Sequence, residues 1–137
     1  MQSKKPVIIS LIIILVIVFI FILVRRADDV SVIESNRTDI VEHIQSIAVF
    51  TFEYYTTEIN GEIRGTFEGL ELPEDYAETE FGTFELIEKT DYEATIQGVS
   101  AHQYGTVEAT VDSTGELHSW SYTGHFDTIP GRYGLKP

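Results

Sequence analysis

The histidines are the side chains of this chain that could bind a metal ion or transfer a proton near neutral pH. They are His43, His102, His118 and His125. No two of them have the HExxH spacing that places a pair of zinc ligands on one helix face. His118 and His125 could approach each other across the last predicted strand and its tail, although ordinary surface positions are the interpretation we favour. The chain has no cysteine, which excludes a disulfide, a thiolate zinc site and a cysteine nucleophile, so we expect neither a metal nor a cofactor.

Carboxylates are plentiful but form no recognisable catalytic motif. The stretch Asp112-Ser113-Thr114-Gly115 is similar to the loop of an aspartic protease, yet it has one residue too many and occurs once, so we expect a turn. Residues 58–80 hold eight acids and one base, Arg64, without the spacing of a calcium loop, and we interpret them as a solvated loop. The sequence also lacks a Gly-x-Ser-x-Gly elbow and a phosphate-binding loop. We expect no catalytic residues and predict that the protein is not an enzyme.

One aromatic group could form a binding surface. His118, Trp120 and Tyr122 alternate within residues 116–123, which would place them on one side of a strand. Aromatic residues at this spacing more often belong to a core, and that is the interpretation we favour. If they face water instead, they are the best candidates for contact with a partner. Asn36-Arg37-Thr38 is an N-glycosylation sequon, which matters only in a eukaryotic secretory compartment.

Two very different parts of the chain must position these residues. The chain has 137 residues, enough for one domain rather than two. Residues 1–26 contain four bases and no acid, whereas residues 27–137 contain all 22 acids and five bases, a net charge of −17. This acidic balance argues against nucleic-acid binding, because phosphate recognition needs a basic surface.

Residues 7–24 form an apolar run in which Ser10 is the sole polar residue. As a helix, the run would span about 27 Å, close to the hydrocarbon thickness of a bilayer. Lys4 and Lys5 precede it and Arg25 and Arg26 follow it, where long basic side chains can reach lipid head groups. A cleaved signal peptide would have a shorter apolar stretch and a small-x-small cleavage site, which is missing here. We therefore predict a single-pass transmembrane segment after a short tail, residues 1–6, with the lipid bilayer as a partner.

The orientation of this segment follows from what flanks it. The flanking bases are nearly balanced, so the positive-inside rule decides little. The tail is short and the remainder is large and acidic, which favours a cytoplasmic N-terminus and an extracytoplasmic C-terminal domain.

Residues 25–58 are predicted to continue the same helix with an amphipathic character. The residues of its packing face recur at spacings of three and four: Val30, Ile33, Arg37, Ile40, Val41, Ile44, Ile47, Ala48, Thr51 and Tyr55. No proline or glycine interrupts residues 7–59. An alternative remains for residues 48–58, because alternating aromatic residues precede Asn60-Gly61, a pattern typical of a hairpin with strands at 50–59 and 62–70. In the helical interpretation Asn60-Gly61 caps the helix, and one short strand is expected near residues 63–67.

Four later segments alternate between apolar and polar residues, as strands with one covered face do. They are residues 83–88, 92–98, 105–112 and 116–123. Short connections suit a meander, and the amphipathic face of the preceding helix is the obvious cover. The predicted fold class is therefore α+β, in which a long N-terminal helix, membrane-spanning and then amphipathic, packs on a small antiparallel β-meander. Residues 59–137 would form the acidic β domain.

A long helix of this kind followed by a short meander resembles a type IV pilin or a type II secretion pseudopilin. Glu53-Tyr54-Tyr55 ahead of Asn60-Gly61 resembles the helix end of that family, and residues 105–117 resemble its last hairpin. The processing glycine and the early helix glutamate of the family are missing, since Lys4-Lys5-Pro6-Val7 stands in their place. The resemblance implies a membrane-anchored structural or assembly subunit that associates with copies of itself, or with other pilin-like subunits, through its N-terminal helix. The alternative is a single-pass binding module that presents the acidic domain to a protein partner or to cations.

Overall fold

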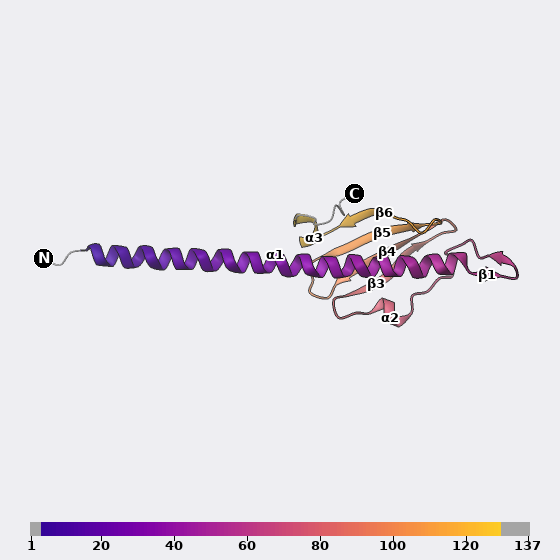
Figure 1. The fold of residues 1–137 in the computed structure, drawn as a ribbon, viewed down its shortest axis with the longest axis horizontal. Helices are drawn as coiled ribbons and strands as arrows, with labels where there is room; N and C mark the ends of the chain where they lie inside the picture. Colours follow the sequence, from indigo (N-terminus) through magenta and orange to yellow (C-terminus); the bar gives the residue numbers. More distant parts are fainter. Residues whose placement is uncertain (1–3, 130–137) are drawn as a thin grey trace. The chain divides into compact units, whose positions relative to one another are not determined.

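The computed structural model describes residues 4–129, except for the side chains of residues 26–28. In this part of the chain, helix α1 (Lys5–Thr56) is followed by a small hairpin, β1 (Glu58–Ile59) and β2 (Glu62–Ile63), and by a short helix, α2 (Glu74–Ala77). The later elements are β3 (Gly82–Lys89), β4 (Glu93–Ser100), β5 (Thr106–Asp112), β6 (Leu117–Tyr122) and a final helical turn, α3 (His125–Thr128) (Figure 1). The predicted α+β fold, a long helix packed on an antiparallel meander, is confirmed.

The chain divides into two compact units, one that ends at Val32 and one that begins at Ile33. Helix α1 contributes residues to both. The predicted tail and the predicted β domain extend into residues 1–3 and 130–137, which lie outside the described residues.

The helical interpretation of residues 48–56 is correct, and the alternative of a strand there is wrong. Ile47, Ala48 and Thr51 are buried at helical spacing, and burial at that period outweighs the alternation of the aromatic residues. The helix ends at Thr56 rather than at residue 58. Asn60 and Gly61 do not cap it. Both have positive φ, 53° and 87°, as a type I′ turn requires, and they join β1 to β2.

The main sheet is the predicted meander. In the described part of the chain, its strands have the order β3-β4-β5-β6, and each pairs antiparallel with its neighbour in sequence. The predicted strands agree with the observed ones to within two residues at each end. The short strand expected near residues 63–67 is instead β2, which pairs with β1 outside the main sheet.

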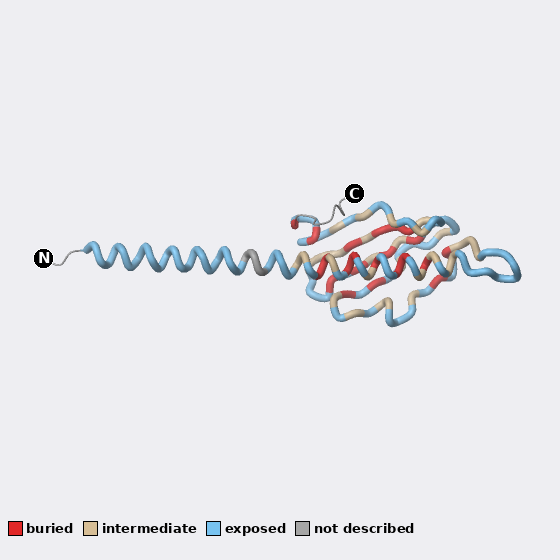
Figure 2. Tube along the Cα trace, viewed as in Figure 1, coloured by how far each residue is buried: buried red, intermediate tan, exposed pale blue. Residues whose placement is uncertain are grey.

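The core lies between the second part of α1 and one face of this sheet (Figure 2). The helix residues below a tenth exposed are Asn36, Arg37, Ile40, Val41, Ile44, Ile47, Ala48 and Thr51, all but Asn36 from the predicted face. They pack on the sheet residues Phe84, Ala94, Ile96, Val107, Ala109 and Val111. A Cβ on Gly98 would lie only 2.7 Å from Ile40 Cγ2 and from Phe84 Cε1, so this glycine allows the helix to approach the sheet.

Two buried polar residues of α1 fasten other segments to the helix. The Asn36 amide donates to the Phe81 carbonyl (3.0 Å) and accepts from the Ser100 hydroxyl (2.7 Å), which joins the start of β3 to the end of β4. The Arg37 guanidinium donates to the carbonyls of Phe126 (2.9 Å) and Ile129 (3.1 Å) and so holds α3. Asn36 is 6% exposed, with both ends of its amide hydrogen bonded, so the sequon is inaccessible in the folded domain.

Shortening side chains of α1 to alanine should lower the unfolding free energy much more at buried positions than at exposed ones. Ile44 is fully buried, and the variant Ile44→Ala should lose about 2–5 kcal/mol of unfolding free energy through the cavity it leaves. Val49 lies on the same helix and is 60% exposed, so Val49→Ala should change stability by less than about 0.5 kcal/mol. Urea unfolding of both variants measures the difference, and equal losses would contradict the packing described.

Candidate functional site

The apolar run forms the first candidate site, a surface for lipid or for other helices. Within the described residues, α1 is the helix that is long and apolar enough to span a membrane. All its large apolar residues from Val7 to Val24 are between 48% and 70% exposed. Lys4, Lys5 and Arg25 are exposed at the ends of the run, and the Arg25 guanidinium lies 5.1 Å from the centre of the Phe21 ring. Arg26 belongs to the helix, but its side chain is outside the described residues.

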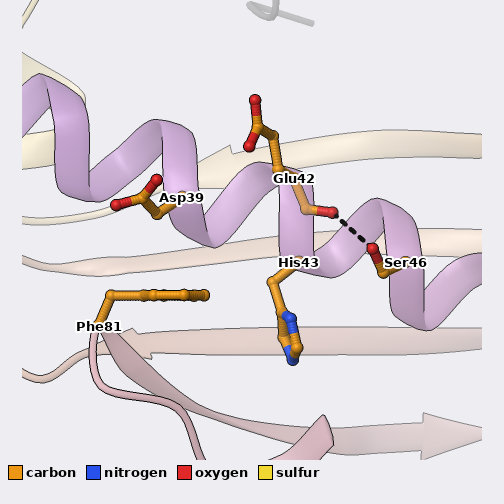
Figure 3. Close-up of a pocket in the computed structure, with 5 residues that line it drawn as sticks. All are labelled: Asp39, Glu42, His43, Ser46 and Phe81. Atoms are coloured by element: carbon orange, nitrogen blue, oxygen red, sulfur yellow. Dashed lines mark hydrogen bonds between the residues drawn. The ribbon is translucent and has the colours of Figure 1, made fainter.

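The second candidate site is an open hollow on the domain, with a volume of about 230 Å³. Its lining residues are Asp39, Glu42, His43, Ser46 and Phe81 (Figure 3). The helix supplies all but Phe81, which lies just before β3 and whose carbonyl is held by Asn36. Positions 39, 42, 43 and 46 share one side of the helix because they are three or four residues apart.

The His43 ring forms the apolar wall of this hollow together with Phe81. Its Nε2 lies 2.8 Å from the Tyr76 carbonyl, which can only accept, so Nε2 carries the hydrogen. Its centroid is 4.3 Å from that of Phe84 and 5.7 Å from that of Phe81. Carboxylates beside aromatic faces bind organic cations such as guanidinium and ammonium groups. The hollow is therefore suited to a basic side chain.

The structure does not bring the predicted aromatic group together. Thr110 pairs with His118 and Glu108 with Ser121, so two residues of β6 oppose one of β5, and Ser119 has a positive φ of 56°. This bulge puts His118 on the face away from the core. Trp120 and Tyr122 are half-buried against the core and stack with 6.5 Å between ring centroids. Burial raises the pKa of the Tyr122 phenol, and the Arg37 guanidinium opposes that rise.

The remaining histidines lie apart from one another. His118 Nε2 is 3.8 Å from a Glu93 carboxylate oxygen, and its Nδ1 is 2.8 Å from the Ser119 hydroxyl. His125 begins α3, where its backbone amide donates to the Tyr104 carbonyl, and His102 is exposed beside the Tyr104 ring. In the described part of the chain, no group of three His, Cys, Asp or Glu residues could hold a metal ion.

Residues 112–115 form the expected turn. Asp112 Oδ1 accepts hydrogen bonds from the Thr114 hydroxyl (2.6 Å), the Thr114 amide (2.9 Å) and the Glu116 amide (3.2 Å). These bonds, with the Thr114 hydroxyl foremost, lower the pKa of the Asp112 carboxyl below its ordinary value of 3.8. The motif that is similar to a protease loop therefore serves the turn between β5 and β6.

Arg64 is the residue of interest that the sequence motifs did not reveal. Its guanidinium lies 3.7 Å from the centre of the Tyr54 ring, at the base of the β1–β2 hairpin. Its Nε is buried without a hydrogen-bond partner among the described residues. The sequence held one signal, since Arg64 is the single base within residues 58–80, but the stacking on Tyr54 depends on the turn that returns the chain to the helix end.

The Asp112 turn gives a pH-dependent prediction. In Thr114→Val, the pKa of Asp112 should rise toward its ordinary value, because the main hydrogen bond to the charged form is lost. Carbon-13 NMR of the carboxyl measures this pKa, and Thr83→Val, an exposed change on β3, is the matched control. A depressed native pKa stabilises the fold above the unfolded pKa, and this contribution disappears as the pH falls through the native pKa. The contribution should be smaller in Thr114→Val, and an unchanged pKa would refute the assignment.

Comparison with known proteins adds no relative to this picture. No protein-family model, no curated protein and no solved structure matches the chain.

Proposed function

We propose that this protein is a membrane-anchored structural subunit of pilin-like build, with residues 7–24 in the bilayer and the domain outside the cytoplasm. The observation that carries the proposal is the exposure of the apolar run, in which every large apolar residue is at least 48% exposed. On the scale for insertion of a helix into a membrane, each Val, Leu, Ile or Phe contributes about 0.3–0.6 kcal/mol, so the apolar residues of the run would stabilise the inserted state by about 5–10 kcal/mol.

The length and the ends of the run support a bilayer rather than a protein core. Its eighteen residues match the hydrocarbon thickness, and all backbone groups within a helix are satisfied internally. Lys5 and Arg25 lie at its two ends, where their side chains can reach the head groups. The proposed orientation, with the N-terminus in the cytoplasm, rests on the large acidic domain that follows the run.

The proposed structural role rests on two features. One is the order of the elements along the chain, and the other is that polar side chains of the domain hold its own backbone. A helix that packs on a short meander is the arrangement that the resemblance to pilins implies. Much of the domain's polar chemistry that is described above, including Asn36, Arg37 and Asp112, is used to hold its own backbone. Copies anchored in one bilayer are also held at a high local concentration, so weak contacts between them can suffice for assembly.

Two charges placed in the run should detach the protein from the membrane. Ile14→Arg combined with Val18→Arg adds about 5–7 kcal/mol to the free energy of insertion, because each arginine near the helix centre costs about 2.5–3.5 kcal/mol. The matched control is Gln45→Arg with Val49→Arg, which has the same charges and spacing at exposed positions of the same helix. Alkaline carbonate extraction of membranes should release the first variant and retain the second. Retention of both would reject membrane anchoring by this run.

Assembly and orientation are tested on the full chain. Chemical crosslinking in a mild detergent should give defined oligomers, and protease added outside intact cells should digest the domain. A retained membrane protein that is strictly monomeric would reject the structural subunit and favour the anchored binding module. Digestion that occurs only after cell lysis would reverse the proposed orientation.

A further inference from the structure

Among the residues that the structure describes, Arg64 has an aromatic partner but no polar partner for its charge. Its guanidinium is stacked on the Tyr54 ring at 3.7 Å, and Tyr54 is itself held by a hydrogen bond from its hydroxyl to the Glu68 carbonyl (3.0 Å). Among the described residues, the guanidinium donates no hydrogen bond and forms no ion pair, and its Nε is buried. The terminal nitrogens therefore remain available to a ligand from outside the molecule.

A guanidinium in this state is suited to a carboxylate. Its terminal N–H groups form a planar fork that matches the two oxygens of a carboxylate. Stacking on Tyr54 fixes the plane of the fork, so little rotamer entropy remains to be lost on binding. The hairpin lies beyond the last residue of α1 (Figure 1), and Arg64 lies half-buried at its base.

The hollow beside Asp39 has the complementary chemistry. It is lined by Asp39, Glu42, His43 and Phe81, and the Asp39 side chain lies on the Phe81 side of the hollow, whereas the Glu42 side chain points away from the two rings (Figure 3). A carboxylate near an aromatic ring suits a guanidinium, so Asp39 is the acid that would receive it. The other bases of the described domain are engaged, since Arg37 holds two carbonyls and Lys89 donates to the Leu70 carbonyl (2.8 Å). Arg64 is thus the basic side chain of the described domain that can enter such a hollow.

We propose that Arg64 of one copy binds the Asp39 carboxylate in the hollow of a second copy. The two groups cannot meet within one molecule, because Asp39 and the helix end at Thr56 are about 25 Å apart along α1. The contact joins two different surfaces and is therefore heterologous, so it can be repeated from copy to copy and does not end at a pair. The inference deepens the proposed structural role by naming a contact between subunits.

Because the chain has no native cysteine, disulfide crosslinking can report this contact cleanly. One full-length chain carries Ser46→Cys at the hollow, and a second carries Glu62→Cys, an exposed position of β2 two residues before Arg64. Mixed in detergent near 0.1 M salt, the two chains should form a heterodisulfide. Adding Arg64→Gln to the second chain should lower the yield about tenfold, because a charge-assisted pair is lost. As a control, Glu53→Arg reverses the charge of another exposed acid on α1, and it should leave the yield of the heterodisulfide unchanged.

A charge swap separates a contact between copies from damage to the fold. Arg64→Asp in the hairpin chain and Asp39→Arg in the hollow chain should each abolish crosslinking with an unaltered partner. When these two variants are mixed with each other, the yield should recover. Far-UV circular dichroism verifies that each variant is folded. An undiminished yield in Arg64→Gln, or no recovery in the swapped mixture of folded chains, would overturn the proposal.

Failure of this contact and failure of the proposed function give different results. The Arg64 and Asp39 variants should stay in the membrane during carbonate extraction, because neither lies in the apolar run. If carbonate releases the Ile14→Arg/Val18→Arg chain but the yield of crosslinking does not depend on Arg64, membrane anchoring would be supported and the contact between copies would be rejected. If crosslinking depends on Arg64 but carbonate also extracts the unaltered chain from membranes, the contact between copies would be supported and membrane anchoring would be rejected.

Discussion

The close approach of helix α1 to the sheet is the constraint on which the rest of the domain depends. Gly98 permits it, since any Cβ there would collide with Ile40 and Phe84. At this distance Ile44 and Ile47 share one buried cluster with apolar residues of β4 and β5, and Asn36 lies within hydrogen-bonding distance of Ser100. The hydrogen bonds of Asn36 and Arg37 therefore coexist with the apolar packing, which sets the distance between the helix and the sheet.

The fold could be predicted from the sequence because its signals are local and periodic. The helical spacing of the buried residues in α1 can be recognised from that segment alone, and so can the alternation of apolar and polar residues in β5. The bulge in β6 could not be predicted in this way, since it arises from how Ser119 and Trp120 share one partner on β5. That single extra residue separated His118 from Trp120, although the sequence placed them together. The hollow depends on Phe81, which is distant in sequence from the helix residues that line it, and the stacking of Arg64 depends on the turn that returns the chain to Tyr54. The sequence held only weak hints of either contact.

The two parts of α1 are both helical, but their side chains suit different surroundings. Residues 7–24 have apolar side chains all around the helix, which suits a surrounding apolar medium. From Ile33 on, one stripe is apolar and the other carries Asp39, Glu42 and Glu53, which suits a helix with protein on one side and water on the other. The net charge of −17 beyond residue 26 opposes contact between copies, so any contact that does form needs a local cation to offset it.

The division of α1 at Val32 and Ile33 has a consequence for the release of the domain. All of the buried core lies on the C-terminal side of that boundary, and so do the residues that Asn36 and Arg37 hold. Among the described residues, a protease that cuts the chain just before Ile33 would remove no side chain of the buried core and would leave the hydrogen bonds of Asn36 and Arg37 in place. A single cut at this boundary would therefore separate the apolar run from a domain that keeps its described packing.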